Sequence, residues 1–497
     1  MPNPFFCISP KQPGLLLMST VRTEGEVSTL PITGGRLMDF PDDPIACMRE
    51  LHAEHGDLAA LEEDGQRIVF AFGSQWNQRV LTDEKSFISR FFSLRGSRNS
   101  AQRRLTSGLL SMNGVEHKAN RRMVMEPFQK KVIASYFDNI CSLTSQMLDD
   151  WRVGQVRNIH EDMTQYMLRV TSSILFGFDV PELSIRIGEM IDHWVHLNHQ
   201  TGMGALRTDA NLSDGYERLL EHAEELEAAI RQMIDLRRSD CEQSTDVLSL
   251  LIRANEQDGG ILSDEKLIGN VALLFGAAHL TTANTLTWTL FLLAQHPSIM
   301  RELHQEISSE VSGALPTVAE ARQLPLMERV VKESMRVLPA SGYLHRNVAD
   351  SAQLGPLELS RGTPVVFSQY ITHHMPELYP DPDTFQPDRW LTISPSPYAY
   401  LPFGAGPRMC IGAPMAMMIL NTALPAILKR YRLSVVPGSE ISGRIVSSML
   451  GPVTDVPMAI SPADGQFHAV PVTGNIQSLV NLPEVPASHA VETRRAA

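Results

Sequence analysis

Cys410 has the surroundings best suited to metal or nucleophile chemistry. It lies in the segment FGAGPRMCIG at 403–412, directly before an apolar stretch at about 411–431 that is predicted to be a helix. Backbone N–H groups and the helix dipole at a helix start favour a thiolate. The glycines permit a tight turn close to a flat ligand, and Arg408 is placed to pair with a carboxylate on that ligand. The alternative is a buried structural cysteine, the usual fate of a free cysteine.

Two pairs of charged residues have spacings that place them on one face of a helix. Glu333 and Arg336 are separated by three positions, and His117 and Arg121 by four. Taken alone, each pair fits an ordinary surface ion pair or a solvated helix face, which contributes little to stability.

Taken together, these segments resemble the cytochrome P450 family. The segment 403–412 matches the pattern FxxGxRxCxG, and ESMR at 333–336 resembles ExxR. DPDTFQPDRW at 381–390 and GVEHKANRR at 114–122 resemble two further motifs of the family. The motifs occur in the family's order, and the resemblance covers roughly 40–460 as one fold.

The resemblance implies a haem b cofactor with the Cys410 thiolate as the axial ligand of its iron. Other residues gain roles only through this resemblance. The haem-binding loop contributes Phe403, Gly404, Arg408 and Gly412; the partners of the haem propionates are His117, Arg121 and Arg346; the buried ion-pair triad consists of Glu333, Arg336 and Arg389.

The central helix departs from the family pattern mainly at the acid position, with a milder change of the usual glycine to Ala278. The family has [AG]-G-x-[DE]-T-[TS], an acid–alcohol pair that helps to deliver protons to iron-bound oxygen in monooxygenases. Here AAHLTT at 277–282 places Leu280 at the acid position and retains Thr281. Leucine cannot donate, accept or relay a proton. Thr281 can still hydrogen-bond a ligand or order a water.

Three explanations of Leu280 are open. A substrate hydroxyl or carboxyl supplies the relay, which is the explanation we favour. Alternatively, water replaces the acid, together with His279, although His279 lies about 100° around the helix from Leu280. In the third case the enzyme needs no relay, because it performs a peroxide-driven oxidation or a redox-neutral rearrangement. A non-enzymatic haem binder or gas sensor ranks last.

The resemblance places substrate contacts at 88–112, in the central helix, at 340–344 and at 449–453. The candidate pocket residues are Ala277, Ala278, Leu344 and Leu450. Their apolar character predicts a small, hydrocarbon-rich substrate. Five arginines between 90 and 104 suggest either a mouth that attracts anions or, as we favour, an exposed basic loop.

Electrons are expected to come from separate proteins, a ferredoxin or flavodoxin and its reductase. The chain contains no GxGxxG fingerprint for a nicotinamide or flavin cofactor and no ferredoxin cysteine cluster. A basic docking patch is predicted at Arg121, Arg122, Lys130 and Lys131, with solvated helix faces as the alternative.

The elements that must position these residues are mostly helical. Helices are predicted at 115–129, 132–150, 158–177, 213–238, 244–254, 264–295, 297–312, 325–337 and 411–431. Short strands are expected at 67–72, 342–350, 352–359 and 364–368. The predicted class is mainly α with small β-sheets, a cytochrome P450 fold with a long central helix. The expected parts are a loose arm at 1–40, the haem domain at 41–465 and a disordered tail at 466–497.

Composition excludes several classes of protein. The 497 residues are 43% hydrophobic and 20% charged, which excludes a disordered or collagen-like chain. A net charge of −13 argues against a nucleic-acid binder. Five scattered cysteines indicate a reducing compartment, so the cytoplasm is expected. We expect a monomer with no membrane span, because 271–294 contains too many polar residues for lipid.

Overall fold

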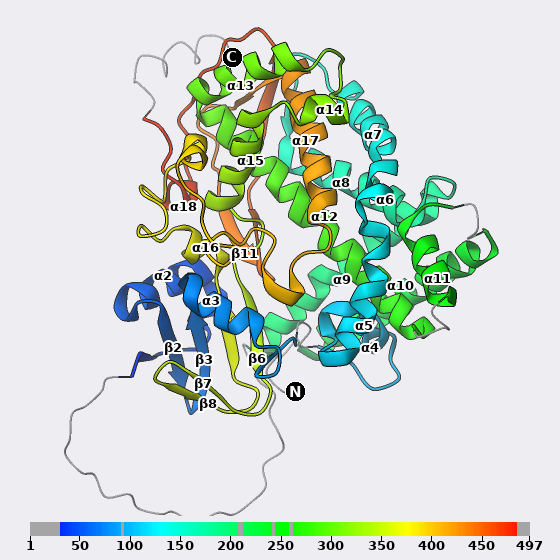
Figure 1. The fold of residues 1–497 in the computed structure, drawn as a ribbon, viewed down its shortest axis with the longest axis vertical. Coiled ribbons are helices and arrows are strands. Elements are labelled where there is room, and N and C mark those ends of the chain that lie inside the picture. Colours follow the sequence, from blue (N-terminus) through cyan, green and yellow to red (C-terminus); the bar gives the residue numbers. More distant parts are fainter. Residues whose placement is uncertain (1–29, 91–93, 207–211, 241–243, 258–261, 485–497) are drawn as a thin grey trace, which may run out of the picture.

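Most of the molecule is helical, with a smaller β-rich lobe at one end (Figure 1). The computed structural model describes residues 30–90, 94–206, 212–240, 244–257 and 262–484. The helices are α1 Asp39–Asp42, α2 Pro44–His55, α3 Gly73–Thr82, α4 Ala101–Leu105, α5 Gly114–Val124, α6 Lys130–Ser135, α7 Phe137–Asp149, α8 Ile159–Phe176, α9 Pro181–Leu206, α10 Leu212–Asp240, α11 Val247–Gln257, α12 Asp264–Gln295, α13 Pro297–Glu310, α14 Val318–Ala321, α15 Pro325–Val337, α16 Gln369–His373, α17 Ala413–Arg430 and α18 Ile476–Leu479. Short 3-10 turns are η1 Leu109–Ser111, η2 Glu126–Phe128, η3 Pro387–Leu391 and η4 Gly406–Arg408.

The strands form four small sheets. They are β1 Ile32–Gly34, β2 Leu58–Glu63, β3 Gln66–Ala71, β4 Phe87–Ile88, β5 Val156–Asn158, β6 Leu344–Val348, β7 Ala352–Leu354, β8 Leu357–Leu359, β9 Pro364–Phe367, β10 Tyr431–Val435, β11 Gly443–Val446, β12 Met449–Pro452 and β13 Pro457–Pro462. The largest sheet has the order β1-β2-β3-β9-β6-β4; the others are β10-β13-β5, β11-β12 and β7-β8. The mainly α class with small sheets is therefore confirmed.

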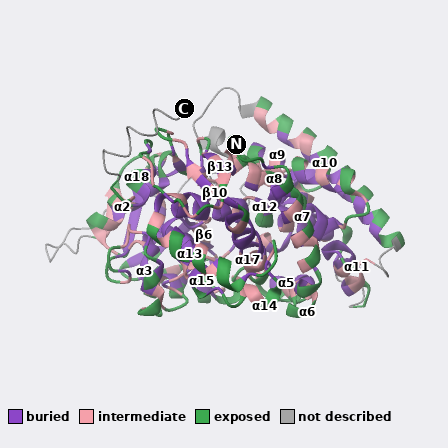
Figure 2. Cartoon of the chain, turned by 90° about the horizontal axis from the view of Figure 1, so that it is seen from above, coloured by how far each residue is buried: buried purple, intermediate pink, exposed green. Residues whose placement is uncertain are grey.

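Helix α12 is the element around which the helical part is built. Ser263 caps its start, because the Ser263 hydroxyl accepts a hydrogen bond from the backbone N–H of Lys266, at 3.4 Å. The helix ends at Gln295, before the His296-Pro297 step that stops further helical turns. It contacts α4, α8, α9, α15 and α17, and Figure 2 shows buried residues gathered around α12 and α17. Its predicted bounds of 264–295 are correct.

Two of the largest differences from the sequence-based expectation lie in helices. The 26-residue helix α9 was not among the predicted elements. The predicted helix at 132–150 is divided into α6 and α7 at Tyr136. Tyr136 is buried, and its hydroxyl donates to the carbonyl of Thr245, so a distant contact holds the chain at this division.

The two chain ends pack more extensively than expected. Strand β1 pairs with β2, and the fully buried Phe40 packs on Phe70, so the described residues 30–40 belong to the fold. At the other end, Ile476 and Val480 are buried, and the backbone N–H of Asn481 donates to Asp383. The expectation of a disordered tail from 466 is therefore wrong for residues up to 484. Residues 1–29 and 485–497 lie outside the described part of the chain.

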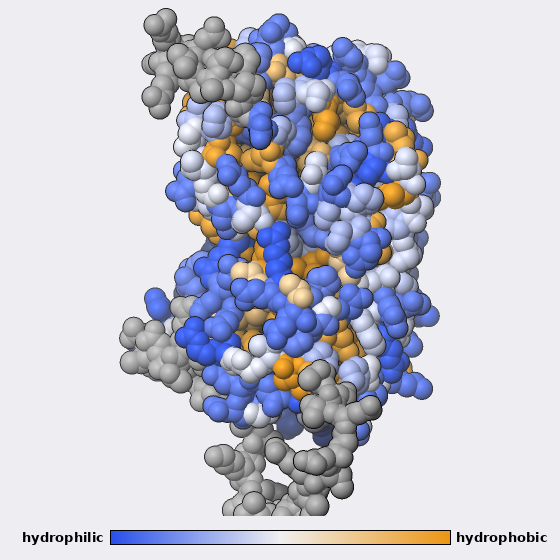
Figure 3. Space-filling view, turned by 90° about the vertical axis from the view of Figure 1, so that its left-hand side faces the viewer, coloured by the Kyte–Doolittle hydropathy of each residue, from blue (hydrophilic) through white to orange (hydrophobic). Residues whose placement is uncertain are grey.

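The surface is chemically mixed. On the face drawn in Figure 3, hydrophobic side chains form separate patches among hydrophilic ones. None of the described helices combines the length and apolar character that crossing a bilayer requires.

Candidate active site

The loop before α17 holds Cys410 in a tight backbone turn. The Cys410 N–H donates to the carbonyl of Phe403, at 2.8 Å, which closes the loop. Gly404 and Gly406 both have positive φ, at 65° and 71°. A Cβ at Gly406 would lie 2.9 Å from the carbonyl oxygen of Leu81, so this position requires glycine on two grounds.

The start of α17 acts on the sulfur of Cys410. Burial raises the pKa of the Cys410 thiol, while the backbone N–H groups of Gly412 and Ala413 and the charge of Arg121 act to lower it. Cys410 is nevertheless exposed, and it is a free cysteine. Hydrogen-bond donors and a positive charge around an accessible sulfur favour a thiolate that can bind a metal.

A cluster of basic side chains surrounds this loop, and we call it the basic cluster: His117, Lys118, Arg121, Arg346 and Arg408. Arg121 donates to the carbonyl of Met409, at 2.6 Å, and Arg408 donates to the carbonyl of Met112 and the side chain of Asn113. Arg346 lies on β6 and pairs with Val365 of the antiparallel neighbour β9. Three separate elements therefore bring these groups to one place.

The basic cluster is short of negative charge. Burial, followed by the charges of its neighbouring arginines, lowers the pKa of His117 to about 4. Burial also lowers the pKa of Arg346 to about 10, and it lowers the pKa of Arg121 and Arg408. Among the described residues, Glu84 is the acidic side chain that opposes these shifts at all three arginines. Buried cations need counter-charges, so the basic cluster fits a group that carries carboxylates, as haem does with its two propionates.

The structure brings the ion-pair triad together in the core. Glu333 and Arg336 are fully buried on α15, and Arg389 is almost so. Arg336 and Arg389 donate to the Glu333 carboxylate, at 2.9 Å and 2.8 Å. Trp390 adds a fourth member that the sequence did not suggest, because its indole N–H donates to Glu333, at 3.0 Å.

The middle of α12 exposes small apolar side chains although most of the helix is buried. Ala277 and Ala278 are exposed, and Leu280 and Thr281 are half-buried. The Thr281 hydroxyl donates to the carbonyl of Ala277, at 2.8 Å, so its proton is engaged within the helix.

His279 does not join Leu280 and Thr281. It is 3% exposed, and its Nε2 lies 3.0 Å from the carbonyl of Thr164 in α8. Its Nδ1 lies 3.8 Å from the Asp192 carboxylate in α9. The helical turn between successive residues directs His279 to the opposite side of α12 from Ala277, so the structure does not place it where it could replace the missing acid.

Two of the expected substrate segments meet each other and α12. Gly342 donates to the carbonyl of Ser448, which joins 340–344 to the β11–β12 hairpin. The carbonyl of Leu450 accepts from Asn284, at 3.4 Å, and from Trp288, at 3.2 Å, both on α12. Leu450 is fully buried, and Leu344 is half-buried on β6.

The arginine-rich segment is held by polar contacts rather than open to solvent throughout. Arg104 makes a two-pronged pair with the buried Glu227 of α10, with both N···O distances 2.6 Å. Gln102, also buried, donates to the carbonyl of Leu94 and to Asn198, and accepts from the indole of Trp194. Arg104 thus has a structural partner, and residues 91–93 lie outside the described residues.

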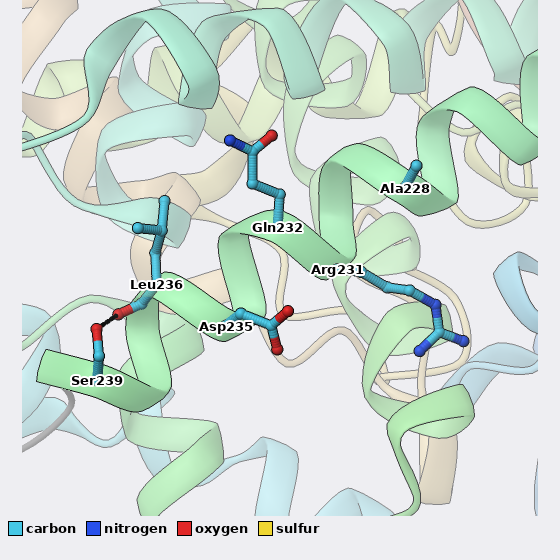
Figure 4. Close-up of a pocket in the computed structure, with 6 residues that line it drawn as sticks. All are labelled: Ala228, Arg231, Gln232, Asp235, Leu236 and Ser239. Atoms are coloured by element: carbon cyan, nitrogen blue, oxygen red, sulfur yellow. Dashed lines mark hydrogen bonds between the residues drawn. The ribbon is translucent and has the colours of Figure 1, made fainter.

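A depression on the outer surface is unrelated to this site. Figure 4 shows that it is lined by residues of α10 alone, among them Arg231, Asp235 and Leu236. None of the residues predicted from the sequence to bind cofactor or substrate lines it.

Comparisons with known proteins agree with this geometry. The family model described as Cytochrome P450 matches residues 30–451. The cyclooctatin synthase of Streptomyces melanosporofaciens is 30% identical over 437 residues, covering 86% of this chain and 94% of the relative. The pentalenene oxygenase of Streptomyces avermitilis is 28% identical over 409 residues, covering 80% and 88%. The retinoic acid-bound cyanobacterial CYP120A1 has a similar fold, with TM-score 0.71 and 20% identity over 83% of this chain and 93% of the other.

Proposed function

The chain belongs to the cytochrome P450 family, and from this premise we propose that it hydroxylates a small, largely apolar terpenoid. It is a monooxygenase with haem b as its cofactor. In the proposed reaction one oxygen atom of O₂ enters a C–H bond of the substrate. The other leaves as water, with two electrons from a separate redox partner and two protons.

The residues that would hold the cofactor come from the loop before α17 and from the basic cluster. We assign the Cys410 thiolate as the iron ligand, and His117, Arg121, Arg346 and Arg408 as partners of the haem carboxylates. When bound, haem with a thiolate ligand supplies the activation of O₂. The ion-pair triad holds α15 against the segment 380–390 and so supports this scaffold.

The observation that carries the substrate proposal is the exposed middle of α12. Ala277 and Ala278 offer surface with no side-chain polar group, and Leu280 is half-buried beside them. An apolar lining favours substrates with a large hydrocarbon part. The cyclooctatin synthase and the pentalenene oxygenase, two similar proteins, are named for terpenoid compounds. A terpene hydrocarbon or a singly hydroxylated terpene is therefore the proposed substrate class.

Proton delivery is proposed to depend on the substrate or on water. Leu280 has no group that can carry a proton, and the Thr281 hydroxyl already donates to Ala277. The Thr281 oxygen can accept a hydrogen bond, so it can orient a water or a substrate hydroxyl beside the reacting atoms. A substrate that already bears a hydroxyl fits this arrangement best.

The electron donor is proposed to be a separate ferredoxin or flavodoxin with its reductase. Arg122, Lys130 and Lys131 are exposed, whereas Arg121 donates to the carbonyl of Met409 in the loop that carries Cys410. Arg121 is therefore removed from the proposed docking patch. The three remaining cations would attract an acidic partner, with a dependence on ionic strength.

The test is turnover with ¹⁸O₂, NAD(P)H and surrogate redox proteins, on a set of terpene hydrocarbons and alcohols. The expected result is a hydroxylated product with one labelled oxygen atom, and a stronger response from alcohols than from hydrocarbons. Product that forms only with added hydrogen peroxide would contradict the dependence on O₂.

A second candidate is peroxide-driven oxidation or a redox-neutral rearrangement, and Leu280 is the observation that favours it. Leu280→Glu restores the acid and separates the two candidates. If proton delivery limits an O₂ reaction, the variant should change the fraction of electrons that appear in product. If peroxide is the oxidant, no electrons are supplied and the fraction of electrons that appear in product cannot be defined. In that case Leu280→Glu should leave peroxide-driven product formation nearly unchanged. Leu280→Ile is the matched control.

A further inference from the structure

Glu84 is an acidic residue inside the basic cluster, and no sequence motif marked it. It lies in the turn after α3, and its side chain is 19% exposed. Its Oε1 is 3.8 Å from His117 Nδ1 and 3.9 Å from Arg408 Nε, and its Oε2 is 3.8 Å from Lys118 Nζ. One carboxylate therefore faces three members of the basic cluster.

Two of the facing atoms lack hydrogen-bond partners. Glu84 Oε1 and His117 Nδ1 are both buried and unpaired in the structure. Each such atom is costly to leave unsatisfied. At 3.8 Å the two atoms are too far apart for a direct bond, but a small side-chain shift or one bridging water joins them. The imidazole nitrogen and the carboxylate oxygen are thus each other's available partners.

The position of Glu84 decides which side of the imidazole is left for another ligand. With Nδ1 directed at Glu84, Nε2 is the ring nitrogen left for another ligand, and it donates only when the imidazole carries a second proton, which a carboxylate placed at Nε2 would stabilise. A carboxylate behind a histidine fixes the orientation of its ring and favours the protonated form at Nδ1, as it does behind metal-binding histidines. The same carboxylate also offsets the mutual repulsion of Arg121, Arg346 and Arg408.

We infer that Glu84 is a positioning residue for haem: it accepts from Nδ1–H of His117 and, together with a haem carboxylate at Nε2, holds the ring doubly protonated so that its Nε2 donates to that haem carboxylate. This inference rests on haem binding by the family and not on the proposed substrate. Its test therefore uses no substrate, and its failure is distinct from a failure of the terpenoid proposal.

The first experiment measures haem release from the purified holoenzyme to an excess of apomyoglobin. Glu84→Gln keeps the size of the side chain and removes its charge, so we expect about tenfold faster release, the loss that one charge-assisted hydrogen bond predicts. Glu116→Gln is the matched control, because Glu116 precedes His117 on α5 but pairs with Lys266 at the surface. Equal release rates for Glu84→Gln and Glu116→Gln would overturn the inference.

A double-mutant cycle shows whether Glu84 acts through His117. We expect His117→Gln to speed release, and the variant with both substitutions to release haem no faster than His117→Gln alone. Independent, multiplying effects of the two substitutions would overturn the inference.

The reduction potential supplies a readout that a purely structural role would not move. Loss of a buried negative charge near the haem should shift the potential of Glu84→Gln upward, with little shift in Glu116→Gln. The carbon monoxide spectrum and the thermal unfolding midpoint check that each variant is folded and still ligated by thiolate. An unchanged potential in folded Glu84→Gln would contradict the placement of Glu84 beside the haem.

Discussion

The two sides of the site are built by different kinds of contact. The proposed cofactor side consists of the loop at 403–412, the basic cluster and the ion-pair triad, and charged or polar hydrogen bonds hold the residues of each part. The proposed substrate side consists of the middle of α12 and the β11–β12 hairpin, and the hairpin is attached to α12 by two hydrogen bonds to the carbonyl of Leu450. The reaction requires a cofactor that is held rigidly, whereas the choice of substrate depends on the residues that line the pocket. The comparison predicts large effects on the cofactor side and modest, selective effects on the substrate side.

The largest expected effect is at Cys410. Cys410→Ala removes the assigned thiolate, so turnover with NAD(P)H and redox partners should fall to background. The long-wavelength band of the carbon monoxide complex, which reports thiolate ligation, should disappear. Cys141→Ala is the control, because Cys141 lies on α7 and is not part of the site. Retention of that band in Cys410→Ala would show that another residue binds the iron.

Glu333→Gln should unfold the cofactor side. Glu333 accepts hydrogen bonds from Arg336, Arg389, Trp390 and the backbone of Gln386, all within 3.0 Å. Loss of its charge leaves two buried guanidinium groups without a counter-charge. This should lower the free energy of unfolding by about 3–5 kcal/mol. Urea unfolding of the holoenzyme measures the change in the free energy of unfolding.

The matched control for Glu333→Gln is Glu328→Gln on the same helix. Glu328 pairs with Lys332 at 2.7 Å, but its side chain is 58% exposed. An exposed pair of this kind contributes about 0–1 kcal/mol. Similar losses in the two variants would contradict the special role of the buried triad.

Acid should destabilise the cofactor side through His373. Its backbone carbonyl accepts from Arg336, and its Nε2 accepts from the backbone N–H of Leu401, at 2.8 Å. Burial, and then the charge of Arg336, lowers the pKa of His373 to about 3 from the usual 6.5. Between these two values the unfolded chain binds the extra proton, so the free energy of unfolding falls as pH falls through this window, by at most about 1.4 kcal/mol per pH unit for this one group.

His373→Gln tests this dependence. Glutamine can still accept from Leu401 but does not titrate, so the slope of stability against pH between 6.5 and about 4 should become shallower. His196→Gln is the control, because His196 is exposed on α9. An identical slope in the wild-type protein and His373→Gln would show that other histidines dominate.

The smallest effect is expected on the substrate side. Trp288→Phe removes one of the two hydrogen bonds to Leu450, which is worth about 1 kcal/mol. The hairpin should remain attached through Asn284 but become less ordered, so the ratio of product regioisomers should change while the haem spectrum does not. Phe291→Leu is the control for altered packing, because Phe291 lies one turn along α12 and packs against the Trp288 ring without bonding to Leu450. Loss of the haem spectrum in Trp288→Phe would contradict the expectation that substitutions on the substrate side leave haem binding unchanged.

Sequence patterns picked out residues that the structure brings together around Cys410 and in the ion-pair triad, but they missed elements that surround them. FxxGxRxCxG and ExxR each lie within one short segment. Their residues are therefore close in space whenever the local turn or helix forms. The bounds of α12 followed from its cap and its terminal His-Pro step, which are local signals. Helix α9 was missed. Residues 466–484 were taken for a tail because distant residues hold them: the backbone N–H of Asn481 donates to the carbonyl of Asp383, and the Tyr370 hydroxyl donates to the carbonyl of Leu479.

The sequence by itself therefore determined the family, the class of fold, the cysteine that is assigned to iron and the missing acid at Leu280. Only the tertiary structure decided which side chains contact the residues of the site. It placed Glu84 beside His117, added Trp390 to the triad, turned His279 away to α8 and paired Arg104 with Glu227. Local patterns encode helices and motif spacing because neighbouring residues share one backbone. A counter-charge or a hydrogen-bond partner can come from any part of the chain, and folding alone brings it into contact.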